Sequence, residues 1–147
     1  MPYRIETPHT TDLPRLLEVW EAAVRTSHDV LDEHDIQVLK PLLISHYFAP
    51  LQLTCIRAAD GQVSGFLGYA AGKVELLFVA PAEQGRGIGK ALLEDAISRL
   101  GATQVDVHEQ NPRALQFYSS LGFRVERRSP LEGGGRPLPI LHLRLIR

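Results

Sequence analysis

The chain has 147 residues, of which 44% are hydrophobic and 22% are charged. That length suits a single domain over residues 1–147, and the apolar fraction excludes wholesale disorder. A formal net charge of −1 excludes the strongly basic surface that is typical of nucleic-acid binding. No apolar run approaches the roughly 18 residues that span a bilayer, and the N-terminus lacks the apolar stretch of a signal peptide. Because Cys55 is the only cysteine, no internal disulfide can form, and we expect a cytoplasmic protein. From the charge and the apolar runs, we expect no nucleic-acid or membrane partner.

The N-terminal third of the sequence predicts one short strand followed by helices. Residues 3–6 fit a first strand. Apolar residues then recur at helical spacing, namely Leu13, Leu16, Leu17, Trp20 and Val24. Thr11 or Asp12 is the expected N-cap, with Pro14 in the first turn. A second helical stretch covers residues 33–47, with one stripe formed by Ile36, Leu39, Leu43 and Tyr47. Pro41 interrupts this stretch and predicts a kink or two short helices.

Three runs of strand length follow, over residues 51–58, 63–70 and 73–80. Asp60-Gly61 separates the first two runs, and Ala71-Gly72 separates the second from the third. Asp-Gly between apolar runs is typical of a β-hairpin, and the second short connection favours another. These runs therefore predict an antiparallel meander.

The second half of the chain alternates helices and strands. A helix is expected from about residue 87 to residue 100, with Ile88, Leu92 and Ala96 on its inner face and Gly101 at its end, and a strand follows over residues 103–108. A strand, a helix and a strand in this order form a right-handed unit whose two strands lie parallel.

The last part of the chain predicts a helix and two strands. Asn111 is the expected N-cap of the helix, Pro112 its first residue, and Gly122 lies just past its end. Strands are expected over residues 124–128 and 140–146. The predicted fold class is α/β (α+β), with about four helices and a mixed, mostly antiparallel twisted sheet of about seven strands around a central parallel pair.

Residues 82–90 carry the most informative chemical pattern. This segment follows a strand and opens a helix, so its backbone N–H groups face outward at the positive end of the helix dipole. Gly87 and Gly89 let a bulky anion approach the main chain, because no Cβ is in the way. Arg86 and Lys90 add positive charge. We therefore expect this segment to bind a phosphate or pyrophosphate.

We compared this segment with three glycine-rich motifs that bind phosphate groups. A dinucleotide-binding fingerprint requires glycine at position 90, where the chain has Lys90. A P-loop requires glycine at position 84 and serine or threonine at position 91, where the chain has Gln84 and Ala91. The pattern that fits is Gln-x-x-Gly-x-Gly, formed by Gln84, Gly87 and Gly89. It resembles the pyrophosphate loop of the GNAT acetyltransferase superfamily, which binds the diphosphate of coenzyme A.

Two further segments carry the same resemblance. Residues 111–123 resemble the family element Asn-x-x-Ala-x-x-x-Tyr-x-x-x-Gly-Phe, and residues 75–81 resemble the strand that leads into the glycine loop. The part of the chain that begins at residues 27–31 and ends at residues 129–131 resembles the sequences of a bacterial subgroup of small GNAT proteins. The resemblance implies an N-acetyltransferase that moves the acetyl group of acetyl-CoA directly to a primary amine of a small molecule, peptide or protein. A non-catalytic acyl-CoA sensor and a transferase that uses a longer acyl-CoA are the alternatives.

The resemblance also implies which residues bind acetyl-CoA. The diphosphate would lie on Gln84, Gly85, Arg86, Gly87, Ile88, Gly89 and Lys90. The pantetheine arm would pair with unpaired backbone groups of the preceding strand, at Leu77, Phe78 and Val79. Asn111 and Ala114 would border the cofactor from the start of the next helix.

Tyr118 is the candidate general acid for the leaving thiolate. It lies one turn after Ala114 on the same helix face, where a small residue leaves room for the cofactor. A phenol has a pKa of about 10 and a thiol one of about 8.5, a mismatch of only about 2 kcal/mol. Glu75 shares strand parity with Leu77 and Val79, and the resemblance implies that a carboxylate in this strand can act as the base through a water molecule. Its rivals are His28, Asp29, His108 and Glu109.

The acceptor pocket is expected between residues 25–34 and 129–139. Trp20, His28, Asp29 and Glu109 are its candidate substrate-binding residues. His108-Glu109 is not a zinc motif, since Pro112 stands where a second histidine would be needed, so we expect no metal. Dimers are common in the family, which makes a homodimer one expectation.

Overall fold

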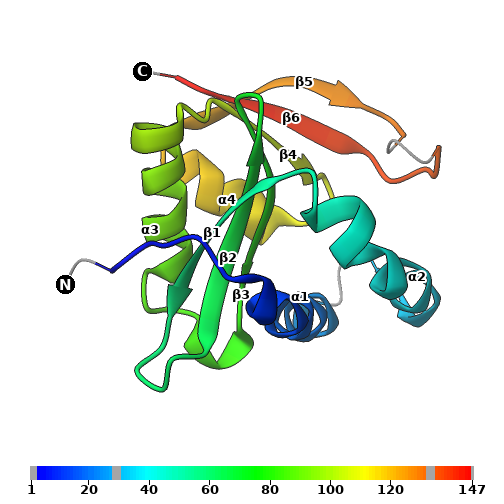
Figure 1. Cartoon of the computed structure of the whole chain (residues 1–147). Helices are drawn as coiled ribbons and strands as arrows, with labels where there is room; N and C mark the ends of the chain where they lie inside the picture. The colour runs from blue at the N-terminus through cyan, green and yellow to red at the C-terminus, as the bar shows by residue number, and fades with distance from the viewer. Residues whose placement is uncertain (1–2, 28–30, 132–134, 147) are drawn as a thin grey trace. The chain divides into compact units, whose positions relative to one another are not determined.

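The computed structural model describes residues 3–27, 31–131 and 135–146, which form two compact units, Met1–Ala102 and Thr103–Arg147 (Figure 1). Each unit has its own three strands, so six strands are described instead of about seven. The single domain over residues 1–147 stays a prediction. None of the helices in the described ranges is long and apolar enough to cross a membrane.

The strand expected over residues 3–6 is wrong. Only Glu6 pairs with the sheet, through an isolated antiparallel bridge to Cys55 in which the two backbone N–H groups donate to the opposite carbonyls over 3.1 and 2.8 Å. The next hydrogen-bonded pair along this segment would need an N–H from Pro8, which has none. On the other side, the register of the neighbouring strand shifts between Ile56 and Arg57. The pairing therefore cannot extend in either direction.

The helical segments that precede the first strand are η1 (Thr10–Asp12), α1 (Leu13–Ser27), α2 (Glu33–Leu39), η2 (Lys40–Leu42) and η3 (Leu43–Phe48). The first segment begins earlier than expected, because His9 is the N-cap and its N–H donates to Asp12 Oδ2 over 2.7 Å. The interruption at Pro41 is confirmed, since this residue lies in the 3₁₀ turn η2. After it, η3 is a π-helix, whose extra residue per turn moves the inward position by one. Tyr47 is therefore exposed and Phe48 is buried.

The predicted meander is confirmed. Strands β1 (Gln52–Arg57), β2 (Val63–Ala70) and β3 (Lys73–Val79) pair antiparallel in that order. The segments α1 and α3 (Ile88–Asp95) lie on opposite faces of this sheet, as Figure 1 shows. The core on the α1 side comprises Leu16, Val19, Trp20, Ile36, Leu43, Phe48, Cys55, Val63, Phe66 and Ala80. The predicted helix over residues 87–100 is confirmed as α3 followed by the π-helical turn η5 (Ala96–Leu100), which ends at Gly101.

Gly65 of β2 allows α3 to approach the sheet. A Cβ at this position would lie 2.7 Å from Cγ2 of Ile88 and 3.3 Å from the carbonyl oxygen of Phe78. Ile88 is the first residue of α3 and is only 3% exposed. The missing side chain of Gly65 therefore determines how closely the start of α3 packs on strands β2 and β3.

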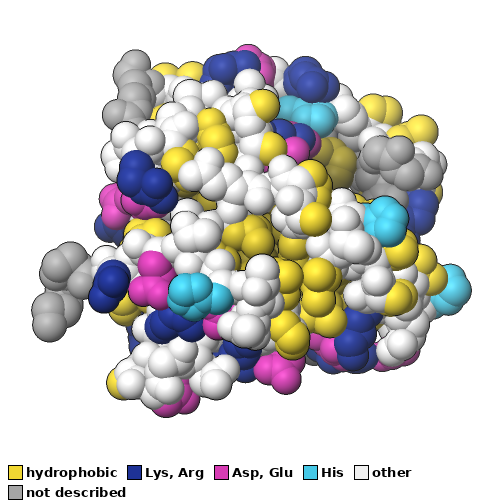
Figure 2. All heavy atoms as spheres, viewed as in Figure 1, with side chains coloured by type: hydrophobic (Ala, Val, Ile, Leu, Met, Phe, Trp, Pro, Cys, Tyr) yellow, Lys and Arg dark blue, Asp and Glu magenta, His cyan; other side chains and the backbone are white. Residues whose placement is uncertain are grey.

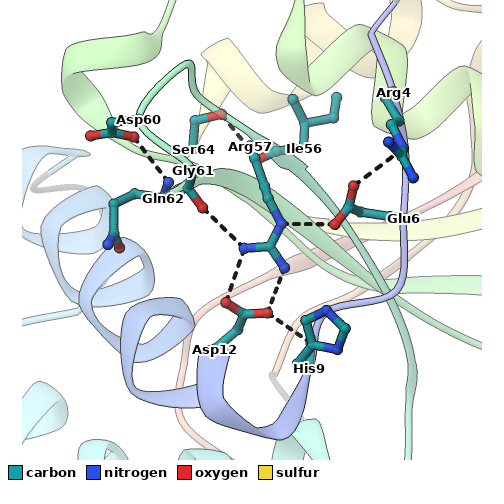
Figure 3. Close-up of polar contacts among 10 residues, drawn as sticks. All are labelled: Arg4, Glu6, His9, Asp12, Ile56, Arg57, Asp60, Gly61, Gln62 and Ser64. Atoms are coloured by element: carbon teal, nitrogen blue, oxygen red, sulfur yellow. Dashed lines mark hydrogen bonds and ion pairs between the residues drawn. The ribbon is translucent and has the colours of Figure 1, made fainter.

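Arg57 connects the N-terminal segment to β1 and η1 (Figure 3). Its Nε donates to Glu6 Oε1 over 2.7 Å, and its two terminal nitrogens donate to the Asp12 carboxylate over 3.0 and 2.6 Å. The terminal nitrogen Nη1 also donates to the carbonyl of Gly61 over 3.1 Å. The hydrogen bonds that Asp12 accepts from the Arg57 guanidinium and from the His9 N–H lower the pKa of Asp12 to about 2.

The second unit contains β4 (Gln104–His108), α4 (Pro112–Ser120), β5 (Phe123–Ser129) and β6 (Ile140–Leu145). The strands β4, β6 and β5 pair antiparallel in this order. The predicted alternation in the last strand is confirmed, because Leu141 and Leu143 are buried while His142 between them is only half-buried. Gly122, just past α4, has a φ of +101°.

Candidate active site

The glycine loop connects β3 to α3 in the first unit. It begins with the 3₁₀ turn η4 (Pro81–Glu83) and continues through exposed residues to Gly87, the N-cap of α3. Gly85 and Gly87 have φ values of +81° and +80°, a left-handed conformation that side chains oppose. A Cβ at either position would meet no atom within 4 Å. These glycines are therefore needed for their backbone conformation, and the space above them is open to a ligand. Gly89 instead lies inside the first turn of α3.

The start of α3 exposes hydrogen-bond donors. The first hydrogen bond of this helix runs from the N–H of Ala91 to the carbonyl of Gly87 over 2.9 Å. The N–H groups of Ile88, Gly89 and Lys90 therefore have no acceptor within the helix. Since the N-cap is a glycine, no side chain caps them either. Three donors and the positive end of the helix dipole together favour an anion at this point.

The side chains around these donors differ in their access to a ligand. Lys90 and Gln84 are exposed, whereas the Ile88 side chain is buried, so only its N–H is available. The Arg86 guanidinium forms an ion pair with Glu83 over 3.0 Å, and its backbone carbonyl accepts a hydrogen bond from the Tyr3 hydroxyl. Arg86 thus helps to order the loop as well as adding charge.

Strand β3 contains an irregularity at Glu75. Leu76 pairs with Gly68 and Val74 pairs with Tyr69, which leaves Glu75 as an extra residue in a β-bulge. Simple alternation along β3 therefore stops at this point, so the face of the Glu75 side chain does not follow from that of Leu77. The Glu75 side chain is exposed and lies 3.7 Å from the Lys73 ammonium group.

The residues after the bulge keep regular pairing with β2. Leu77, Phe78 and Val79 pair with Leu67, Phe66 and Gly65, in that order. The Phe78 ring packs against the Phe66 ring on the α1 side of the sheet, with 5.8 Å between the two ring centroids. Leu77 and Val79 alternate with Phe78 and therefore face the side on which α3 lies.

In the second unit, α4 begins as predicted. The Asn111 side chain accepts a hydrogen bond from the N–H of Ala114 over 3.1 Å, and Pro112 is the first helical residue. Asn111 Oδ1 therefore caps the helix, which leaves its amide NH₂ as the group suited to reach a ligand. Tyr118 lies one turn after Ala114 on the same helix.

Tyr118 is a buried phenol. It is 8% exposed, and its ring makes edge contacts with the rings of Phe117 and Phe123 at centroid distances of 5.1 and 5.8 Å. Burial raises the pKa of Tyr118 well above its ordinary value, because an aromatic environment solvates a phenolate poorly. The phenol therefore stays protonated at neutral pH, which is the form that a general acid needs.

Two of the four predicted substrate-binding residues, Trp20 of the first unit and Glu109 of the second, lie within the described residues. Trp20 is 3% exposed and lies in the hydrophobic core, so its position does not support contact with a substrate. The Glu109 carboxylate forms two hydrogen bonds with Arg128, of 2.7 and 3.0 Å, which lower the pKa of Glu109 and make it a weaker base. His28 and Asp29 lie outside the described residues. Within the described ranges, no three His, Cys, Asp or Glu side chains are placed to hold a metal ion.

The sequence interpretation missed the part that Gly65 plays in placing the glycine loop. A glycine inside an otherwise apolar strand is a known indication of close approach by another element. The pattern Val63-Ser64-Gly65-Phe66 contains this indication, but it does not say which element approaches.

Comparison with known proteins gives a consistent result. Residues 51–125 match the family described as "Acetyltransferase (GNAT) domain". The chain is 33% identical to the peptidyl-lysine N-acetyltransferase YjaB of Escherichia coli (strain K12), over 89% of this chain and 88% of that protein. It is 30% identical to the peptidyl-lysine N-acetyltransferase YiaC of the same strain, over 82% and 83% of the two chains.

Solved structures show the same fold. The solution structure of apo-form YjaB from Escherichia coli matches with a TM-score of 0.87 and 30% identity, over 99% of both chains. The structure of YncA from Salmonella typhimurium with its cofactor acetyl-CoA matches with a TM-score of 0.69 and 22% identity, over 99% of this chain and 94% of that one. The chain therefore belongs to the GNAT family: it has the family's mixed α/β fold and is an acyltransferase.

Proposed function

We propose that this protein transfers the acetyl group of acetyl-CoA directly to the side-chain amine of a lysine in a peptide or protein. The observation that carries the proposal is the set of N–H donors at the start of α3. They directly follow two glycines in the left-handed conformation, and no atom lies within 4 Å of where the Cβ of either glycine would be. The names of the relatives, which are peptidyl-lysine N-acetyltransferases, support the lysine acceptor.

The cofactor diphosphate fits the glycine loop on physical grounds. The N–H groups of Ile88, Gly89 and Lys90 supply donors without a helix partner, and the Lys90 ammonium group adds a full positive charge. A ligand phosphate can approach Gly85 and Gly87 closely because neither carries a Cβ. We assign the pantetheine arm to the backbone of residues 77–79. Acetyl-CoA, when bound, supplies the activated acetyl group.

Tyr118 is the proposed general acid. Its raised pKa keeps the proton on the phenol until a stronger base than water forms beside it. The thiolate that leaves during acetyl transfer is such a base, and the low polarity that raises the pKa of the phenol also raises that of a thiol. The difference in pKa between the Tyr118 phenol and the cofactor thiol therefore stays small enough for proton transfer. Glu75 remains the proposed base, acting through a water molecule from its exposed position in the bulge.

A thiol-release assay tests the function. Purified protein and acetyl-CoA are mixed with lysine-containing peptides that have a blocked N-terminus, and with the same peptides in which the lysine is replaced by norleucine. We expect thiol release only with lysine, together with a mass increase of one acetyl group on the peptide. Binding of acetyl-CoA without turnover on any amine would instead favour the acyl-CoA sensor. Faster turnover with propionyl- or succinyl-CoA would favour a longer donor.

A homodimer stays a prediction. The described surface has three exposed apolar side chains in the segment from α2 to η3, namely Val38, Leu42 and Tyr47, with exposed fractions of 50%, 37% and 44%. Figure 2 shows hydrophobic side chains at the surface over this segment. These residues are the first to mutate if light scattering gives the mass of two chains.

A further inference from the structure

Tyr3 connects the N-terminal segment to the glycine loop. Its hydroxyl donates a hydrogen bond to the carbonyl of Arg86, 83 positions later in the chain. The segment is anchored three residues after Tyr3, where the Glu6 backbone pairs with Cys55 of β1 and the Glu6 carboxylate accepts from Arg57 over 2.7 Å. Figure 1 shows the N-terminal segment passing along β1. The phenol of Tyr3 therefore joins an anchored segment to the loop that opens α3.

Arg86 lies at the point of the loop whose backbone is easiest to turn. It stands between Gly85 and Gly87, which have φ values of +81° and +80°. Glycine accepts positive and negative φ about equally well, so the peptide unit between Arg86 and Gly87 can turn over at little steric cost. The ion pair of the Arg86 guanidinium with Glu83 holds the end of a long side chain and leaves this peptide unit free to turn. The Tyr3 hydroxyl instead binds the peptide unit itself.

The hydrogen bond at the carbonyl also sets the direction of an N–H group. The peptide unit between Arg86 and Gly87 is planar and trans, so its C=O and N–H point in opposite directions. Because the Arg86 carbonyl points to the Tyr3 hydroxyl, the Gly87 N–H points away from Tyr3. Among the described residues, this N–H has no acceptor. It is therefore a donor whose direction Tyr3 controls from the other side of the peptide plane.

The Gly87 N–H belongs to the anion site at the start of α3. Gly87 is left-handed, and the next residue, Ile88, begins a right-handed helix. Neighbouring residues of opposite hand bring successive N–H groups into one concavity, which binds anions. Here those groups belong to Gly87, Ile88 and Gly89. Turning over the peptide unit between Arg86 and Gly87 would remove the first of these donors.

The surroundings of Tyr3 separate its hydrogen bond from its packing. Tyr3, Arg57, Glu83 and Arg86 are among the residues that line an open cavity of about 430 Å³ in the first unit. The Tyr3 side chain is 38% exposed, so its ring is only partly packed. A phenylalanine at position 3 keeps the ring and loses only the hydroxyl. Tyr3→Phe therefore tests the hydrogen bond to Arg86 with little change in packing.

We propose that Tyr3 is a positioning residue for the diphosphate of acetyl-CoA. Its hydroxyl holds the Arg86 carbonyl so that the Gly87 N–H joins the donors of Ile88 and Gly89 at the bound diphosphate. The proposal rests on the proposed function, which assigns the diphosphate to this loop. Tyr3 acts through Arg86 and not on the reacting atoms. Its effect should therefore fall on the binding of the cofactor and leave the transfer step unchanged.

The first experiment measures the Kd for CoA by titration calorimetry and the steady-state kinetics with a lysine peptide. We expect Tyr3→Phe to raise the Kd roughly 3- to 10-fold, and the KM for acetyl-CoA by the same factor, at an unchanged kcat. Tyr47→Phe is the matched control, because Tyr47 is a similarly exposed phenol, and it should behave as the wild type. A wild-type Kd in Tyr3→Phe, or a lower kcat at an unchanged KM, would overturn the proposal.

A donor without the diphosphate separates positioning from a general effect on the fold. Acetyl-pantetheine has the thioester and the pantetheine arm of acetyl-CoA but no diphosphate. We expect Tyr3→Phe to lower kcat/KM for acetyl-CoA by the factor found in calorimetry and to leave kcat/KM for acetyl-pantetheine unchanged. An equal loss with both donors would show a purely structural role and overturn the proposal.

A third measurement needs no variant. In ¹⁵N-labelled wild-type protein, we expect the amide ¹H signal of Gly87 to move downfield when CoA is added, because its N–H then donates to a charged phosphate oxygen. Movement of the Ile88 and Gly89 signals without that of Gly87 would overturn the role of Tyr3 and leave the diphosphate site in place. Absence of CoA binding by the wild type would instead overturn the proposed function, and the role of Tyr3 with it.

Discussion

Replacing Gly87 by alanine tests whether the start of α3 is the anion site. Gly87 has a φ of +80°, and a Cβ there would meet no atom within 4 Å, so the substitution adds backbone strain without a clash. The strain of an L-residue in the left-handed region is roughly 1–2 kcal/mol. The new methyl group also projects into the open space where a phosphate would approach the N–H groups of α3. Loss of one charge-assisted hydrogen bond costs about 1.5–3 kcal/mol.

Gly101 provides a matched control at the other end of the same helical segment. It also has a φ of +80° and open space around its missing Cβ. Gly87→Ala and Gly101→Ala should therefore destabilise the fold to a similar extent in urea denaturation. Only Gly87→Ala should weaken acetyl-CoA binding, by about 10- to 100-fold in titration calorimetry, since each 1.4 kcal/mol corresponds to a factor of about 10. Equal Kd values for Gly87→Ala and the wild type, or equal losses in both variants, would refute the assignment.

Three further predictions concern the acid, the helix contact and the N-terminal cross-link. Tyr118→Phe should lower turnover by roughly 10²–10⁴-fold in the thiol-release assay while the Kd for acetyl-CoA stays constant; wild-type turnover would remove Tyr118 from its role. Gly65→Ala should lower the free energy of unfolding by about 1–3 kcal/mol in urea, because its Cβ would lie 2.7 Å from Ile88 Cγ2. The pKa of Asp12 is lowered from 3.8 to about 2, so its ion pair stabilises the fold above pH 3.8 and this contribution is lost as the pH falls toward 2. Asp12→Asn should lower the free energy of unfolding by about 1–2 kcal/mol at pH 7, a range that is reduced to allow for solvent screening of the partly exposed pair. Denaturation curves of this variant should also depend less on pH between 3.8 and 2. An unchanged dependence on pH would contradict the role of the Arg57–Asp12 ion pair.

Much of this fold could be predicted from the sequence, because it depends on interactions between near neighbours. Strand β2 has the bounds expected from the turns on either side of it, at Asp60-Gly61 and Ala71-Gly72. Asn111 caps α4 with a hydrogen bond to a residue three positions away. Pro41 breaks its helix through its own missing N–H. Each of these features needs only a few consecutive residues, so a sequence pattern contains all the information.

The candidate site was predictable to the same degree. The glycine loop is one continuous segment, and its backbone conformation follows from glycines at fixed positions. What the pattern misplaced was the role of each glycine: Gly85 and Gly87 have the left-handed conformation, whereas Gly89 is helical. The bulge at Glu75 was also not predictable, because a bulge is a property of two paired strands.

Tertiary structure alone decided the features that depend on distant partners. Trp20 is as compatible with a substrate pocket as with a core until the elements around it are in place, and its burial settles its position in the core. The π-helical turn that exchanges Tyr47 for Phe48 at the inward position is visible only in the folded segment. The hydrogen bond from the Tyr3 hydroxyl to the Arg86 carbonyl joins residues that lie 83 positions apart, so no local pattern contains it. Sequence therefore determines local backbone conformation, while tertiary packing determines which distant groups meet.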